Sequence, residues 1–111
     1  MGEIYKKPYY AVIFKSKRSH GDNGYSDMSD KVEARVNGVD GFLGADSVRN
    51  SDGIGITVSY WASLEAIEKW KYDTLHMQAK ASGREKWYEE YSIRICKVEY
   101  DNFFENERLH L

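Results

Sequence analysis

The sequence has little of what marks secreted, membrane-spanning or nucleic-acid-binding proteins. It contains one cysteine, Cys96, which excludes an internal disulfide and a zinc site built from several cysteines. Its longest apolar stretches have about five residues, far fewer than the ~20 that cross a bilayer. With 16 basic and 18 acidic side chains the net charge is -2, so no basic excess favours nucleic acid. We therefore expect neither nucleic acid nor a membrane as a partner.

The amino-terminal segment carries no recognisable targeting signal. Residues 1–8 end at the single proline, Pro8, and lack the apolar stretch of roughly 7–15 residues that is typical of a signal peptide. We expect this segment to be a flexible lead-in. The lone cysteine fits a reducing compartment, so we expect a soluble cytoplasmic protein.

Aromatic residues, by contrast, are abundant. Nine Tyr, four Phe and three Trp make up 14% of the 111 residues, a length that fits one domain. In a domain of this size such side chains line a core, a pocket or a subunit interface. Metal donors are sparse: His20 and Asp22 are neighbours in the polar loop 18–24, and two donors do not make a site. We expect no bound metal.

Hydrophobic periodicity predicts the order β-α-β-β-α-β. Four segments are rich in aromatic and β-branched residues and are predicted strands: 9–17, 41–50, 54–61 and 91–100. Two segments repeat apolar residues every three or four positions and are predicted helices, 25–37 and 64–81, with a further helical turn at 84–90. Right-handed crossovers then give an α+β fold of ferredoxin-like topology, a four-stranded antiparallel sheet with both helices on one face. This domain spans residues 9–100, and 101–111 form a polar tail.

The predicted sheet is apolar on both faces, although the helices can cover only one. Residues 9–14 (YYAVIF) place apolar side chains on both sides of the first strand. In the strand 54–61, Ile54, Ile56 and Val58 share one face. A large exposed apolar surface usually binds something. We therefore predict a homodimer formed through the sheet face.

Several motifs, taken in order, resemble those of the antibiotic biosynthesis monooxygenase (ABM) family. Residues 41–44 (GFLG) resemble the family's turn-and-strand signature. Residues 57–61 (TVSYW), 63–66 (SLEA) and Trp70 resemble its strand-end Trp, SxEA helix start and helix Trp, and His76 stands where many members carry a His. The resemblance spans residues 9–100. It implies a dimeric α/β barrel, in which two four-stranded sheets lie face to face and each subunit has a cavity between sheet and helices.

The resemblance implies more than one possible activity. Some ABM proteins oxygenate aromatic polyketides without metal or flavin, others bind and degrade haem, and many have no established activity. The haem-degrading branch uses an Asn on the first strand, a Trp on the second helix and a haem-ligating His ten residues later. Here Trp70 matches, but Lys80 occupies the His position and Ile13 and Phe14 stand near the expected Asn. These departures argue against haem, and we expect no tightly bound cofactor.

Two residues are candidates for catalysis. His76 could act as a general base. On one straight helix over 64–81 it faces solvent, whereas a helix restart capped by Asp73-Thr74 would turn it toward the cavity. Tyr25 begins the first helix, and its hydroxyl could orient a phenol or quinone; alternatively it only anchors the helix start.

Five residues are candidates for binding the substrate: Trp70, Phe14, Arg84, Trp87 and Trp61. Trp70 and Trp61 are either core residues or walls that stack on a planar ligand. Arg84 could pair with an anionic group of the ligand while Trp87 flanks it. Alternatively these two residues fasten a short helical turn to the sheet. Cys96, in a strand, is expected to be buried and inert.

Two main hypotheses follow, with haem chemistry as a third. In the first, the protein is a monooxygenase that uses no tightly bound cofactor and acts on a small planar phenol- or quinone-like substrate, bound in a cavity lined by Trp70, Tyr25, Phe14 and Trp87. In the second, the same aromatic residues belong to a non-catalytic dimer that binds a small aromatic ligand. A cavity of several hundred Å³ with converging polar groups favours the enzyme, and a filled core favours the binding protein.

Overall fold

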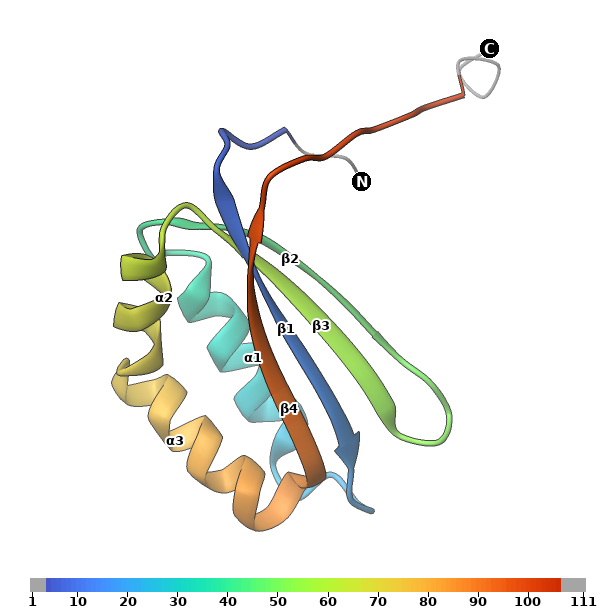
Figure 1. Ribbon diagram of the computed structural model, residues 1–111. Helices are drawn as coiled ribbons and strands as arrows, with labels where there is room; N and C mark the ends of the chain where they lie inside the picture. The colour runs from blue at the N-terminus through green and yellow to red at the C-terminus, as the bar shows by residue number, and fades with distance from the viewer. Residues whose placement is uncertain (1–3, 107–111) are drawn as a thin grey trace.

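The computed structural model describes residues 4–106, which form one antiparallel sheet with a layer of helices on one side (Figure 1). The elements follow in the order β1 (Tyr9–Arg18), α1 (Tyr25–Val36), β2 (Phe42–Arg49), β3 (Ile54–Trp61), α2 (Leu64–Lys71), α3 (Thr74–Ser82), a π-helical turn η1 (Gly83–Trp87) and β4 (Tyr88–Val98). The strand order is β2-β3-β1-β4, and every neighbouring pair is antiparallel. The predicted ferredoxin-like fold is confirmed. Within residues 4–106 the longest helix has 12 residues, and none has the length and apolar character to cross a bilayer.

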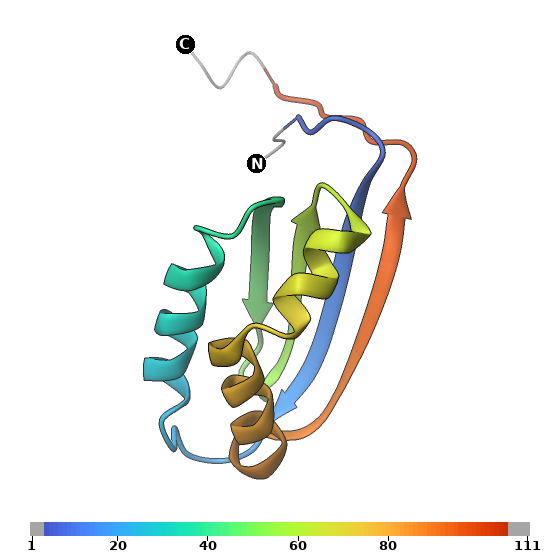
Figure 2. The ribbon, with the colours of Figure 1, turned by 90° about the vertical axis from the view of Figure 1, so that its left-hand side faces the viewer.

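The central strand β1 sets which side chains face the helices. Val12 packs against the buried Trp61 and Trp70, so Tyr10, Val12 and Phe14 point to the helical layer. Figure 2 shows that α1, α2 and α3 all lie on this side, while β4 forms an edge that they leave open. The opposite side of the sheet has no helix over it.

The segment predicted as one helix over 64–81 is two helices, so that prediction is wrong as it stands. Ser63 caps α2, its Oγ accepting from the Ala66 amide at 3.1 Å. The chain leaves the helix at Tyr72, and Asp73 caps α3 by accepting from the amides of Leu75 (3.0 Å) and His76 (3.2 Å). The helix restart capped by Asp73-Thr74, the alternative considered from the sequence, is therefore present. It turns the axis of α3 away from that of α2 (Figure 1).

The end of the helical layer also differs from the prediction. Gly83 does not stop the helix but continues it into η1 with φ -59°, and it is buried. A Cβ there would lie 2.9 Å from Cε2 of Tyr88, so glycine permits a close approach of turn and strand. Because η1 ends at Trp87, β4 begins at Tyr88 rather than at residue 91.

The core is small and lies at one end of the helical layer. Trp61 is 2% exposed and packs with Ala66 and Trp70. No residue of α1 or α3 is buried. Cys96 is exposed, so its predicted burial is wrong: it pairs with Ala11 on the side of the sheet that no helix covers. Most of the space between sheet and helices is therefore bordered by half-buried side chains.

Residues flanking the domain meet on the uncovered side of the sheet. The ring of Tyr5 lies edge-on to Tyr9 at 5.2 Å and tilted against Tyr60 at 5.8 Å. Asp101 accepts from Lys7 Nζ at 2.6 Å and from the Tyr9 hydroxyl at 2.7 Å. After Asp101 the chain leads away from the sheet (Figure 1). The first three residues of the expected lead-in and the last five of the expected tail lie outside the described residues.

Candidate functional site

The predicted site residues all lie on the helix-facing side of the sheet or in the layer above it, but in two separate groups. One group is Trp61, Trp70 and His76, near the start of β1. The other gathers around Tyr88, which pairs with Arg18 at the opposite end of β1. The structure therefore does not join Trp70 with Tyr25, Phe14 and Trp87 in one continuous wall.

The first group is built by the break between α2 and α3. The imidazole of His76 stacks on the indole of Trp70, with ring centroids 4.6 Å apart and planes 11° apart. Its Nδ1 lies 2.9 Å from the Trp70 carbonyl oxygen. Since a carbonyl oxygen only accepts, Nδ1 carries the hydrogen and Nε2 of the neutral ring keeps a free lone pair. Burial lowers the pKa of His76 below its ordinary 6.5, so the neutral form predominates at pH 7.

Trp70 serves both the core and this stack. It is 9% exposed, with the centroid of the Trp61 ring 6.5 Å away and that of the His76 ring 4.6 Å away. Trp61 lies deeper and donates from Nε1 to Ser59 Oγ at 2.9 Å. Of these two tryptophans, Trp61 is thus a core residue, which was one of the two alternatives for it.

The second group surrounds two tyrosine hydroxyls. Tyr25 lies edge-on to Trp87 (5.8 Å) and Tyr88 (6.2 Å), and Phe14 lies edge-on to Tyr88 (5.4 Å). The guanidinium carbon of Arg18 stands 3.6 Å from the centre of the Tyr25 ring. Burial, followed by the charge of Tyr25 and a hydrogen bond to it, raises the pKa of Tyr88 well above 10. The Tyr88 hydroxyl therefore remains protonated at neutral pH and can act as a hydrogen-bond donor.

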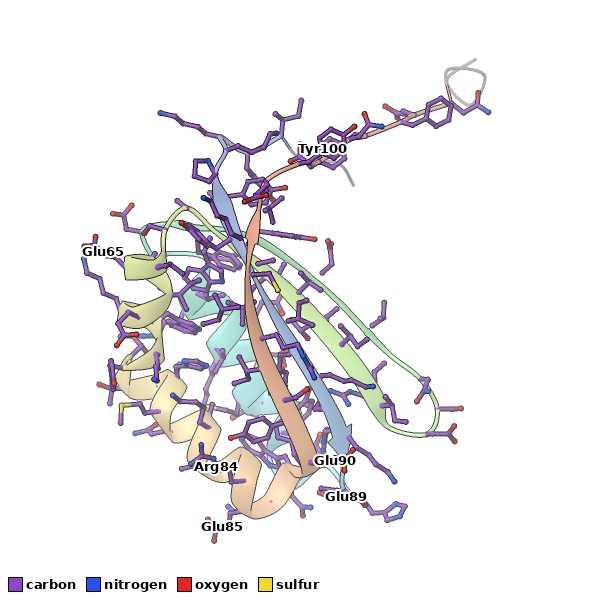
Figure 3. All side chains as sticks on the ribbon, viewed as in Figure 1. Glu65, Arg84, Glu85, Glu89, Glu90 and Tyr100 are labelled. Atoms are coloured by element: carbon purple, nitrogen blue, oxygen red, sulfur yellow. The ribbon has the colours of Figure 1, made fainter. Side chains whose placement is uncertain are left out.

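Trp87 and Arg84 have structural partners. Trp87 is 5% exposed and donates from Nε1 to the Asn23 carbonyl at 2.9 Å, which fastens the polar loop 18–24 to η1. Arg84 is exposed and donates from Nε to the Tyr91 hydroxyl at 2.7 Å. Figure 3 places Arg84 at the end of the helical layer, beside Glu85 and far from Glu65.

Polar residues of β2 and β3 form a third feature, which the sequence reading missed. Four side chains in alternate positions face the helical layer: Ser47, Arg49, Thr57 and Ser59. The Ser47 and Thr57 hydroxyls lie 2.6 Å apart, and Ser47 and Arg49 are exposed. We call these four residues the polar floor. A sheet surface under helices is ordinarily apolar, so the polar floor departs from the usual pattern.

A signal for this floor was present in the sequence. Strand 54–61 alternates Ile54, Ile56 and Val58 with Gly55, Thr57 and Ser59. Trp61 has the same parity as Thr57, and a tryptophan just before a capped helix is expected to pack beneath it. That parity assigns the polar row, not the isoleucine row, to the helix side.

Hollows in the described part of the chain include two of unequal size. One, of about 490 Å³, lies where the N-terminal arm meets the start of α2, between Tyr10, Pro8 and Glu65. The other, of about 200 Å³, lies against the outer side of α3 between Tyr72, Lys80 and Arg84. Neither is lined by Trp70, Tyr25, Phe14 or Trp87. Across residues 4–106 no group of three or more His, Cys, Asp or Glu side chains is placed to hold a metal ion.

Comparisons with known proteins agree with this architecture. No protein-family model matches the chain. The chain is 47% identical over 98 residues to the uncharacterized protein YqjZ of Bacillus subtilis (strain 168), covering 88% of this chain and 86% of YqjZ.

Solved structures resemble the fold at low sequence identity. A variant of SnoaB, a cofactor-independent oxygenase of Streptomyces nogalater, matches with a TM-score of 0.72 at 8% identity, covering 84% of this chain and 95% of SnoaB. A candidate antibiotic biosynthesis monooxygenase of Nitrosomonas europaea matches with 0.73 at 9% identity, covering 87% and 97%. One from Caulobacter crescentus matches with 0.73 at 14% identity, covering 84% and 92%. The chain thus belongs to the same family as YqjZ and has the fold of the antibiotic biosynthesis monooxygenase domains.

Proposed function

We propose that this protein is an oxygenase that acts on a planar phenolic or quinone-like molecule bound between its sheet and its helices, without a tightly bound cofactor. The observation that carries the proposal is the His76–Trp70 pair. It combines a flat aromatic surface with an imidazole whose Nε2 has no hydrogen-bond partner among residues 4–106 and whose pKa is lowered by burial. A neutral base beside an aromatic platform suits the deprotonation of a phenol. The cofactor-independent SnoaB, which shares the fold, supports this reaction class by analogy.

The chemistry can be written for 1-naphthol as a model substrate. Nε2 of His76 takes the phenolic proton, and the electron-rich carbon para to the oxygen then attacks O₂. The peroxide that forms loses its outer oxygen as water and leaves a carbonyl. One naphthol and one O₂ thus give one 1,4-naphthoquinone and one water, with all four electrons supplied by the substrate. The protein's part is to bind, orient and deprotonate.

The active form is proposed to be a homodimer whose subunits pack through the uncovered sheet face. Val48, Ile54 and Ile56 point to this side and are 73%, 40% and 39% exposed. Covering such a strip removes apolar surface from water. Tyr5, Tyr9 and Tyr60 continue the same face toward the termini.

Oxygen uptake with 1-naphthol at pH 7.5 tests the proposal. We expect turnover with one O₂ consumed per quinone, one labelled oxygen in the quinone when ¹⁸O₂ is supplied, and a rate at least about a hundredfold lower for His76→Gln. Asn37→Gln, an exposed position at the end of α1, serves as the matched control. Equal rates in wild type and His76→Gln would remove His76 from the mechanism.

Haem does not fit the residues present. Lys80, at the position where the haem-degrading branch has its ligand, donates its Nζ to the Lys71 carbonyl at 3.0 Å. Ile13 points to the uncovered face. A haemin titration checks this: no saturable Soret shift at tens of micromolar is expected. A shift that is lost on adding reductant in air would assign haem degradation instead, and saturable binding of 1-naphthol without oxygen uptake would assign the non-catalytic dimer.

A further inference from the structure

The guanidinium of Arg49, in the polar floor, is held by hydrogen bonds but keeps donors without a partner among residues 4–106. Its guanidinium lies flat over Gly55, where an added Cβ would come within 2.6 Å of the guanidinium carbon. Nη1 donates to the Gly53 carbonyl at 2.6 Å, and Nη2 donates to the buried Ser16 hydroxyl at 3.0 Å. The Nε hydrogen and one Nη2 hydrogen have no hydrogen-bond partner in the described part of the chain. A seated guanidinium with two free donors is prepared for a planar anion.

A second arginine reinforces the positive charge at this end of the sheet. Arg18 donates from Nε to the Trp87 carbonyl and from Nη2 to the Gly21 carbonyl, both at 3.0 Å. The charges of Arg49 and Arg18 both reach Tyr88, where each opposes the upward shift of its pKa. Among residues 4–106, the ion pairs involve other cations: Lys7, Lys17, Lys31 and Arg35. The charge of Arg18 also acts on the Asp22 carboxylate and helps to lower its pKa. Arg49, in contrast, forms no ion pair among residues 4–106.

The neighbouring groups are suited to the same kind of ligand. Ser47 and Thr57 present hydroxyls one row along the sheet from Arg49 and Gly55. Phe14 and Tyr88 add aromatic edges beside them. The helix-facing surface thus offers a charged end for an anion and a flat apolar side for a ring.

We propose that Arg49, supported by Arg18, binds the carboxylate of a planar aromatic acid, so that the natural ligand is an acid rather than a neutral phenol or quinone. This inference deepens the proposed function, on which its choice of ring system rests. It also assigns the anion-binding role to Arg49 instead of Arg84. Arg84 differs in lying outside the polar floor, at the hollow on the outer side of α3.

Binding of a matched pair of ligands tests the assignment without requiring turnover. Tryptophan fluorescence is followed during titration with 1-hydroxy-2-naphthoate and with 1-naphthol, in the absence of oxygen. We expect the acid to bind at least tenfold more tightly than the phenol to the wild-type protein. Arg49→Gln should abolish that preference while leaving 1-naphthol binding within about twofold. Gly55→Ala, which keeps the charge but displaces the guanidinium, should reduce the preference as well.

Controls separate this site from general electrostatics. Lys31→Gln removes one positive charge from the outer side of α1, and it should leave the preference unchanged. Arg84→Gln tests the rival: loss of the preference there, with Arg49→Gln unaffected, would overturn the proposal. So would equal binding of both ligands to wild type, or no saturable binding of the acid up to millimolar concentration. Because oxygen uptake is measured separately, a preference for the acid without turnover would contradict the oxygenase and not the anion site.

Discussion

Near the β2–β3 turn, the two faces of the sheet carry the opposite of the usual distribution. The face without helices presents Val48, Ile54 and Ile56 to solvent. The face beneath the helices carries hydroxyl groups and Arg49 over β2 and β3. In most half-covered sheets the helices lie over the apolar side and water meets the polar side. The outer face is therefore suited to bind a second apolar surface, and the inner face is suited to bind a polar or charged ligand.

The first expected effect is the loss of the dimer formed through the outer face. Ile56→Asp places a carboxylate in the proposed dimer interface without a partner, and burial of an unpaired charge is costly. We expect the dimer dissociation constant, measured by sedimentation equilibrium, to rise at least about a hundredfold, equivalent to about 3 kcal/mol. Leu64→Asp, at an exposed apolar residue of α2, should leave it unchanged. A wild-type protein that is monomeric at micromolar concentration would refute the interface.

The next effect concerns the apolar end of the inner face. Trp61→Ala removes the most buried large side chain and leaves a cavity against Trp70 and Ala66. The free energy of unfolding in urea should fall by about 3–5 kcal/mol. Tyr100→Ala, at a residue that is 79% exposed (Figure 3), should change it by less than about 0.5 kcal/mol. Similar losses in both variants would mean that the core does not lie under α2.

A pair of glycines sharpens the account of how α2 meets the sheet. Gly41 has φ +89°, and a Cβ there would lie 2.6 Å from Cβ of Ala66 in α2. Gly24 has φ +87° with nothing within 4 Å. Gly24→Ala should cost only the backbone strain, about 1 kcal/mol, and Gly41→Ala should cost clearly more, about 2 kcal/mol or above. Equal losses in thermal unfolding would show that contact with Ala66 is unimportant.

The smallest effect is a pH dependence. Because burial lowers the pKa of His76 below 6.5, the folded protein binds fewer protons there than the unfolded chain. This contribution to stability is full above pH 6.5 and is lost as the pH falls from 6.5 through the folded-state pKa. The carboxyls of Asp22, Asp73 and Asp101 titrate lower, since their pKa lies below 3.8.

Urea unfolding between pH 5 and 7.5 measures this slope. We expect a decrease in stability on acidification that His76→Gln flattens, and an NMR titration midpoint of His76 below 6.5. A midpoint above 6.5 would show that the ring is not buried against Trp70.

The sequence predicted the fold well because the fold depends on local signals. Strand 54–61 was predicted to the residue, since Asn50 to Gly53 mark a turn and Ser63 marks a helix start. The break at Asp73 was harder, because the apolar stripe runs through it without interruption. Periodicity depends only on which residues are apolar, so it does not reveal that the Asp73 carboxylate accepts hydrogen bonds from two backbone amides.

The site was less predictable because it depends on pairings between distant residues. The Arg49 guanidinium is positioned by Gly55, across the hairpin, and by the Ser16 hydroxyl on the next strand. Trp87 was expected, as an alternative, to fasten the helical turn to the sheet, whereas its hydrogen-bond partner is the Asn23 carbonyl of the loop, 64 positions away. Every residue has a backbone carbonyl, so a hydrogen bond to one cannot be predicted from composition or spacing.

A crystal structure of the protein grown with 1-hydroxy-2-naphthoate would locate both the ligand and the second subunit. We expect the acid between sheet and helices, with its carboxylate on Arg49 and its ring beside Phe14 and Tyr88. We also expect a second subunit on the face of Ile54 and Ile56. A ligand seated on the outer sheet face, or in the hollow beside Arg84, would contradict the assignment of the inner face as the binding site.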